Sequence, residues 1–129
     1  IGNSADALGV DSVAIGSSAQ GQDNDTIAIG NNAEGLAVGA IGIGREAEAE
    51  AIDSIALGRR SDATTQGAIA IGGDGTDTGI AGAQATGSEA IALGGDTLSS
   101  GDQAIAIGQA SDATNAGTIA LGLAAAAGG

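Results

Sequence analysis

The chain has 129 residues, of which 25 are glycine and 43% are hydrophobic, and it contains no aromatic residue, methionine, cysteine, histidine or proline. Sixteen acidic residues against three arginines give a net charge of −13, which argues against binding to the phosphate backbone of a nucleic acid. The absence of cysteine excludes disulfides, thiol nucleophiles and thiolate metal sites. No run of about 20 apolar residues is present, so we expect no direct membrane insertion by this segment.

A dipeptide of Ile or Leu followed by Gly recurs at every fourteenth position along the chain. The exception lies between Gly72 and Gly94, whose separation exceeds one period by eight inserted residues. A strict short period is typical of a solenoid, in which each repeat packs only on its neighbours. We therefore expect residues 1–129 to form one solenoid segment, with an insertion within 73–90, cut from a longer chain.

Each repeat contains a block of large, small, large and glycine, and β-branched residues at alternate positions of this block predict a short strand. Glycine after the strand predicts a sharp turn. The predicted turn glycines are Gly16, Gly30, Gly44, Gly58, Gly72, Gly94, Gly108 and Gly122. We assign the large side chains to the core of the coil, namely Val13, Ile15, Ile27, Ile29, Ile41, Ile43, Ile55, Leu57, Ile69, Ile71, Ile91, Leu93, Ile105, Ile107, Ile119 and Leu121.

A second short strand is predicted a few residues after each turn, where two small residues flank one that is mostly acidic. The acidic positions are Asp6, Glu34, Glu48, Asp62 and Asp112, with Gln20 and Leu98 as exceptions. Large side chains from the first strand would then pack against small ones from the second across a narrow coil. This pattern predicts an all-β, parallel β-roll of about nine 14-residue coils.

The small residue in the middle of each first strand forms an uncharged column, which we expect to be covered by another copy of the chain. The predicted trimer interface is therefore Ala14, Ala28, Ala56, Ala70, Ala92, Ala106 and Ala120.

The 14-residue period and the blocks Ser-Val-Ala-Ile-Gly at 12–16 and Thr-Ile-Ala-Ile-Gly at 26–30 resemble the YadA-like head repeats of trimeric autotransporter adhesins. The resemblance extends from Ile1 to Gly122. It implies a left-handed, homotrimeric parallel β-roll at the bacterial cell surface, where an extracellular head attaches to host-surface or extracellular-matrix proteins by multivalent contact. Handedness is implied by the resemblance alone. The family's basic neck, stalk and membrane anchor have no counterpart here, so a viral tail fibre or spike on a virion, or a structural spacer, stay as alternatives.

Head repeats of the form Asn-Ser-Val-Ala-Ile-Gly-x-x-Ser are linked in this family to collagen binding. The nearest matches here are residues 11–19 and 53–61, and both begin with Asp in place of Asn. Most of the motif is also what a β-roll repeat requires, so the match does not by itself indicate a collagen ligand.

Residues that support catalysis are scarce, since the chain has no His, Cys, Lys or Tyr that could act as a base or nucleophile, so we expect neither an enzyme nor a cofactor. The stretch 72–77 matches the start of calcium-binding β-roll nonapeptides, which makes Asp74 and Asp77 the candidates for a metal site. Gly79 stands where that motif needs a hydrophobic residue, and no adjacent copy follows. We therefore predict no metal.

The three arginines lie in two adjacent repeats, Arg45 in one and Arg59 with Arg60 in the next. Beside the acidic column they would relieve repulsion between stacked carboxylates. As the basic residues of an acidic chain they are also the candidate ligand-contacting residues. An ice-binding face is not favoured, because Thr26 and Thr118 share a column whose other positions are serine or alanine.

Overall fold

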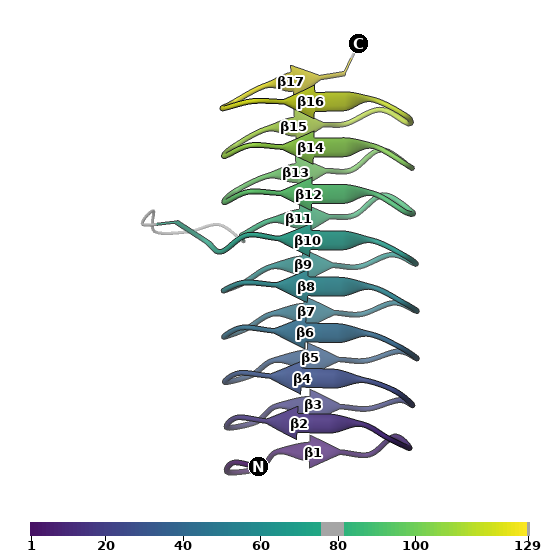
Figure 1. Cartoon of the computed structure of the whole chain (residues 1–129), viewed down its shortest axis with the longest axis vertical. Coiled ribbons are helices and arrows are strands. Elements are labelled where there is room, and N and C mark those ends of the chain that lie inside the picture. Colours follow the sequence, from purple (N-terminus) through teal and green to yellow (C-terminus); the bar gives the residue numbers. More distant parts are fainter. Residues whose placement is uncertain (76–81, 129) are drawn as a thin grey trace.

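The structure is a computed structural model that describes residues 1–75 and 82–128, and it is a rod of stacked coils with the two termini at opposite ends (Figure 1). The two-residue strands form a nine-stranded sheet: β1 (Asp6–Ala7), β3 (Gln20–Gly21), β5 (Glu34–Gly35), β7 (Glu48–Ala49), β9 (Asp62–Ala63), β11 (Gln84–Ala85), β13 (Leu98–Ser99), β15 (Asp112–Ala113) and β17 (Ala126–Ala127). The three-residue strands form an eight-stranded sheet: β2 (Val13–Ile15), β4 (Ile27–Ile29), β6 (Ile41–Ile43), β8 (Ile55–Leu57), β10 (Ile69–Ile71), β12 (Ile91–Leu93), β14 (Ile105–Ile107) and β16 (Ile119–Leu121).

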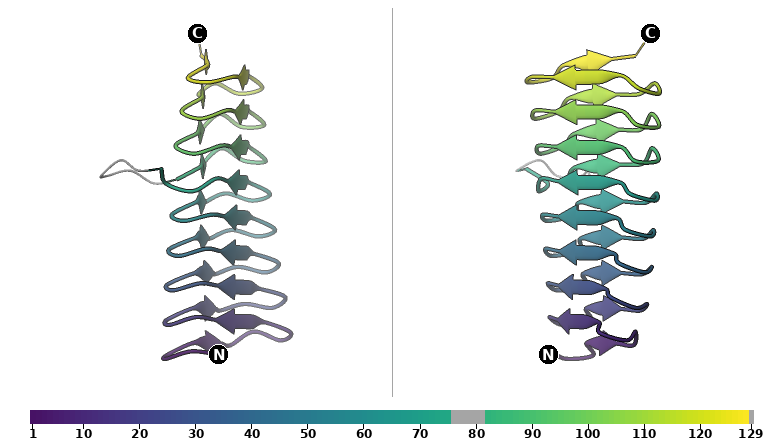
Figure 2. Two further views of the ribbon diagram at one scale, coloured as in Figure 1. Left: turned by 60° about the vertical axis from the view of Figure 1, so that its left-hand side comes forward. Right: turned by 45° about the vertical axis from the view of Figure 1, so that its right-hand side comes forward.

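Strands alternate between the two sheets along the chain, so each coil contributes one strand to each sheet (Figure 2). The described residues give eight such coils and part of a ninth, which confirms the predicted parallel β-solenoid. Within residues 1–75 and 82–128 there is no helix with the length and apolar character that crossing a membrane requires.

Every strand pair is parallel and in register with its equivalent in the next coil. Ala28 pairs with Gly42 and Glu34 with Glu48, and the members of each pair are separated by one period of the sequence. The pairing continues across the insertion, where Ile69 faces Ile91. Identical repeat positions therefore form straight columns along the rod, about 4.8 Å apart from one coil to the next.

The interior of the coil is made of alanine, and here the sequence-based assignment of the two faces was wrong. The middle residues of the eight-stranded sheet point inward, with exposed fractions of 0–6% for Ala14, Ala28, Ala56, Ala70, Ala92, Ala106 and Ala120. The flanking large residues point outward: Val13 is 38% exposed and Leu57 40%. The same reversed assignment applies to Ile15, Ile27, Ile29, Ile41, Ile43, Ile55, Ile69, Ile71, Ile91, Leu93, Ile105, Ile107, Ile119 and Leu121, all of which are half-buried or exposed.

Volume explains this reversal. The two sheets lie so close together that methyl groups fill the space between them, and Ala56 packs in one cluster with Ala49, Ala63 and Ala70. A column of isoleucine on the inward face would force the sheets apart, since packed interiors accept extra methylene groups only at a cost in strain. The column predicted to bind a second chain is therefore buried within one chain and has no side-chain surface to offer.

Buried hydroxyl groups complete this narrow core by bonding to backbone carbonyls. Thr26 Oγ1 donates to the Asp23 carbonyl oxygen at 2.9 Å, and Ser54 Oγ donates to that of Ala51 at 2.7 Å. Ser111 Oγ donates to the Gly108 carbonyl oxygen at 2.8 Å. Each buried hydroxyl group thus has a hydrogen-bond partner at a turn, so burying it carries little desolvation cost.

All eight predicted turn glycines have a positive φ, between 122 and 150°. At Gly44 the φ is 138°, and a Cβ there would collide with the carbonyl oxygen of Gly58 in the next coil. Only glycine accepts both the backbone conformation and this close approach.

The periodic bonds of the roll continue to Asp74 and the chain is bonded to the roll again at Gly82, so the insertion lies within the predicted range 73–90. Asp74 N donates to the Arg59 carbonyl oxygen at 2.8 Å, and Gly82 N donates to that of Arg60 at 2.7 Å. Asp74 and Gly82, on the two sides of the insertion, are therefore bonded to two consecutive residues of the coil below. Asp77, one of the metal candidates, lies outside the described residues.

Candidate binding surfaces

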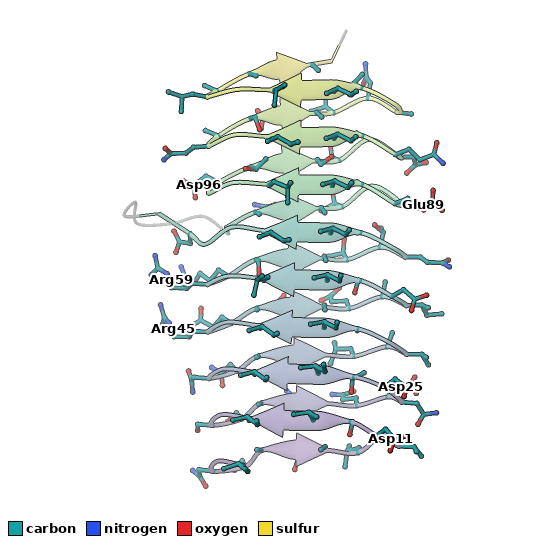
Figure 3. The ribbon with its side chains drawn as sticks, in the orientation of Figure 1. Asp11, Asp25, Arg45, Arg59, Glu89 and Asp96 are labelled. Atoms are coloured by element: carbon teal, nitrogen blue, oxygen red, sulfur yellow. The ribbon has the colours of Figure 1, made fainter. Side chains whose placement is uncertain are left out.

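The first candidate surface is the outward face of the eight-stranded sheet, which we call the apolar face. It consists of the first and last residues of strands β2, β4, β6, β8, β10, β12, β14 and β16, all of them Val, Ile or Leu. In Figure 3 their side chains cover the front of the sheet from end to end. Two aliphatic side chains per coil on a flat sheet make a continuous apolar strip of a kind that monomeric proteins seldom leave in water.

The second candidate surface is the outward face of the nine-stranded sheet, which is acidic in the middle of the rod. Glu34, Glu48 and Asp62 pair in register on successive strands, so their carboxylates stack in one column. Gln20 Nε2 donates to Glu34 Oε1 at 3.2 Å and covers one end of that column.

Two carboxyl groups of this column have raised pKa values. Partial burial, together with the charge of Glu50, raises the pKa of Asp62 above its usual range, and Asp62 Oδ1 is a buried atom without a hydrogen-bond partner. Partial burial, followed by the charges of Asp62 and Glu34, raises the pKa of Glu48. The column therefore resists ionisation, as stacked like charges should.

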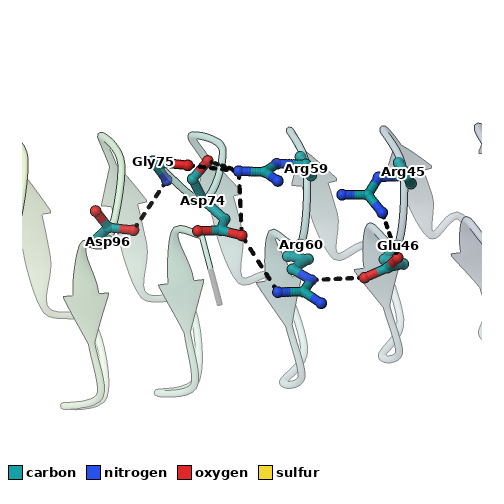
Figure 4. A network of polar contacts seen from close by, with 7 residues as sticks. All are labelled: Arg45, Glu46, Arg59, Arg60, Asp74, Gly75 and Asp96. Carbon is teal, nitrogen blue, oxygen red and sulfur yellow. Dashed lines mark hydrogen bonds and ion pairs between the residues drawn. The ribbon is translucent and has the colours of Figure 1, made fainter. Parts of the chain in front are cut away.

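The third candidate site is the basic cluster beside Asp74 and Gly75, and it brings together the three predicted ligand-contacting residues Arg45, Arg59 and Arg60 (Figure 4). Arg60 Nε donates to Glu46 Oε2 at 2.7 Å, and Arg45 Nη1 contacts Glu46 Oε1 at 3.0 Å. The bond from Arg60 lowers the pKa of Glu46. Glu46 thus lies between two guanidinium groups from successive coils.

Arg59 and Arg60 also hold the first residues of the insertion. Arg59 Nη2 donates to the carbonyl oxygens of Asp74 and Gly75, each at 2.6 Å, and lies 3.3 Å from Asp74 Oδ2. Arg60 Nη1 reaches the same carboxylate oxygen at 3.4 Å. On the other side, Gly75 N donates to Asp96 Oδ1 at 3.4 Å. The cluster therefore fixes the start of the insertion from the coils on both sides.

This arrangement does not fit a calcium ion at Asp74. Its side chain is 2% exposed, and the oxygen atom Oδ2 is taken by two guanidinium groups. Oδ1 is buried without a partner, but a cation beside two arginines would meet their positive charge. In the part of the chain that the structure describes, no three acidic side chains come together as metal ligands.

Sequence reasoning missed Glu46 and Asp96 as members of the basic cluster. Glu46, Arg60 and Asp74 follow one another at the repeat period, and Asp96 follows Asp74 after one period plus the insertion. In a solenoid whose coils stack in register, that spacing places all four residues in one column. The sequence period could therefore have identified Glu46 and Asp96 as neighbours of the arginines. The outward apolar face was missed for a different reason, since alternation alone does not tell which face is inside.

Comparison with curated protein sequences gives no match. The family model described as the YadA head domain repeat matches residues 1–19, 7–33, 37–61, 49–74, 81–97 and 99–125, which together span most of the chain. These segments contain all eight three-residue strands and all eight turn glycines. The chain therefore belongs to the YadA head domain repeat family.

Proposed function

We propose that this chain is the head of a trimeric autotransporter adhesin, a non-enzymatic protein exposed outside the bacterial cell that attaches to host-surface or matrix proteins. Family membership supports the adhesin class. The observation that carries the trimer is the apolar face, a strip of aliphatic side chains along a rod whose net charge is −13. Such a strip is stable in water when other copies of the same strip cover it.

Three chains with their apolar faces directed at a common axis would bury these side chains together. The acidic face of the nine-stranded sheet would then lie on the outside of the trimer. Repeating each exposed feature three times around one rod multiplies weak contacts into a useful overall affinity, which suits a head that works by attachment.

The mass of the chain in solution tests the trimer. Light scattering should give three times 11.9 kDa for the unmodified chain. The double variant Ile43→Glu with Ile71→Glu introduces a charge into the apolar face at two coils and should give 11.9 kDa. Asp112→Ala, on the outside of β15, serves as the matched control and should stay trimeric. A monomeric unmodified chain would overturn the proposal.

Attachment itself is tested on surfaces coated with collagen or with fibronectin. The trimer should be retained at concentrations at least about tenfold lower than the monomeric double variant, because avidity is lost with the second and third copies. Equal retention of trimer and monomer would show that multivalent contact is not how the head attaches.

A further inference from the structure

The apolar face is bordered by two edges of different chemical character, which Figure 3 shows on opposite sides of the strands. The edge that follows each strand of the eight-stranded sheet carries Arg45, Arg59 and Asp96, and we call it the basic-cluster edge. The edge that precedes each strand carries Asp11, Asp25 and Glu89, and we call it the acidic edge. A rotation that brings three apolar faces to one axis also brings the basic-cluster edge of each chain against the acidic edge of the next.

Rotation about an axis parallel to the rod keeps each residue at its own height. Along the chain, Asp53 comes after Arg45 and before Arg59, half a coil from each, on the opposite edge. Asp53 belongs to the column of Asp11, Asp25 and Glu89, so it lies on the acidic edge. In a neighbouring chain it would therefore stand at a height between Arg45 and Arg59.

The side chains at this height are available for such a contact. Asp53 is exposed. Arg45 contacts Glu46 through Nη1, yet 48% of its side chain stays exposed, and 40% of the Arg59 side chain is exposed. Guanidinium groups carry five N–H donors, so the contacts within the chain leave capacity for a further carboxylate.

Two exposed apolar residues on the acidic edge lie half a coil below and half a coil above Arg45. Val38 is 39% exposed and Ile52 is 48% exposed, and their positions in the chain bracket Arg45 from the coils on either side. In the coils above, Gln66, Ser88 and Asp102 occupy this repeat position. The aliphatic stems of arginine cover apolar surface well, so Val38 and Ile52 offer a matching second contact.

We propose that Arg45 and Arg59 of one chain bind Asp53 of the next chain, with Val38 and Ile52 packed beneath the arginine stems, and that this contact fixes the register of the trimer. The inference rests on the proposed trimer and adds to it the residues that join one chain to the next. The arginines are confined to these two coils, so sliding one chain by a single coil would leave Asp53 beside only one of the two guanidinium groups, and sliding it by two coils would leave it beside neither. The apolar face is nearly the same in every coil and cannot set register by itself.

Crosslinking between engineered cysteines tests the contact, because the natural chain contains no cysteine. An arginine–aspartate pair holds its Cα atoms too far apart for a disulfide, so a short bis-maleimide is the suitable reagent. The double variant Arg45→Cys with Asp53→Cys should give covalent trimers on a denaturing gel. The two cysteines lie on opposite edges of one chain, so such a product reports contact between chains.

Two controls separate this arrangement from others. Arg45→Cys with Gln103→Cys places the second cysteine in the same column as Asp53, three coils higher, and should give no covalent trimer. Arg45→Cys alone should give no crosslinked product, whereas a two-fold contact between two basic-cluster edges would give covalent dimers. Crosslinked dimers from the single variant would overturn the inference.

Charge removal gives an independent readout of the same contact. Asp53→Ala should raise the concentration at which half of the trimer dissociates by about tenfold, and this effect should fade in high salt. Asp11→Ala, which removes an exposed carboxylate from the same column, is the matched control and should leave that concentration unchanged, because Asn3 and Ser17 occupy the repeat positions of Arg45 and Arg59 there. A trimer by light scattering without the Arg45–Asp53 crosslink would overturn this inference while the proposed function stands. A monomer would overturn both.

Discussion

Glu48 and Asp62 are register partners on β7 and β9, so two carboxylates of the acidic face stack directly on one another. Partial burial raises the pKa of both groups, and each is raised further by acidic neighbours. The stacked geometry of the solenoid, which stabilises apolar columns, here holds like charges together. The register of these strands thus lowers the free energy of unfolding by an amount that depends on pH.

We predict that the free energy of unfolding falls as pH rises from about 4 upward through the raised pKa values of Asp62 and Glu48. The ordinary values are 3.8 and 4.5, and above them the unfolded chain loses protons that the folded chain still holds. Stability from these groups is therefore present at low pH and lost as they ionise. Urea unfolding followed by circular dichroism between pH 3.5 and 7 measures it.

Asp62→Asn should remove much of this dependence. At pH 7 the variant should be more stable by about 0.5 kcal/mol, a small value because Asp62 is only half-buried and solvent screens its charge. Asp112→Asn changes an exposed carboxylate of the same repeat position and should shift the urea midpoint little. A midpoint for Asp62→Asn that is lower than that of the unmodified chain at pH 7 would contradict the proposed repulsion.

The arginine pair at the insertion leads to a second prediction. Arg60→Ala removes one partner of Glu46 and one partner of Asp74, whose side chain is buried. We expect a small loss in the free energy of unfolding, less than for a fully buried pair, because Arg60 is exposed to solvent. Hydrogen exchange should become faster at the amides of Asp74 and Gly82, which bond to the coil below. Arg60→Lys should recover only part of the protection, since one ammonium group cannot span both carboxylates.

Much of the fold could be predicted from the period. The 14-residue repeat with its β-branched pair identified strands such as Ile27–Ile29 and their parallel neighbours, because register in a solenoid repeats the sequence period. The direction of the faces could not be obtained in the same way. A strand of Ile, Ala and Ile alternates equally well in either orientation, and the decision rests on how far apart the two sheets lie, which is a property of the closed coil.

The candidate sites were predicted in part. Arg45, Arg59 and Arg60 were identified as the basic residues of an acidic chain, and the structure brings them together. Their contact with Asp74 was missed although Asp74 follows Arg60 by one period. The bond from Gly82 to Arg60 could not be predicted, because the inserted residues break the period. The apolar face was missed because the inward and outward faces of the eight-stranded sheet were assigned the wrong way round. The predicted interface of alanines therefore lies on the inward side of the same strands.

The narrow core leads to a third prediction, at Ala56 in the middle of β8. Its neighbours in the sheet are Gly42 and Ala70, and all three are buried. Ala56→Leu adds three carbon atoms where methyl groups already touch, so we expect a loss of about 3 kcal/mol in the free energy of unfolding, at the upper end of overpacking effects. Ile55→Leu, a change of shape on the outward side of the same strand, should cost less than about 1.5 kcal/mol. Urea midpoints compare the two, and equal losses would contradict the inward direction of Ala56.

The turn glycines provide a last prediction, which separates backbone strain from collision between coils. Gly44 and Gly122 have φ values of 138 and 122°, a region that side chains rarely adopt. A Cβ on Gly44 would meet the carbonyl oxygen of Gly58, whereas a Cβ on Gly122 has no atom within 4 Å. Gly122→Ala should therefore cost about 1–3 kcal/mol from strain alone. Gly44→Ala should cost more, because the next coil must also move away and the ladder beside it would lengthen. If thermal unfolding gave the same loss for both variants, strain would account for the whole effect, and close stacking of the coils would not be the reason for glycine at this turn.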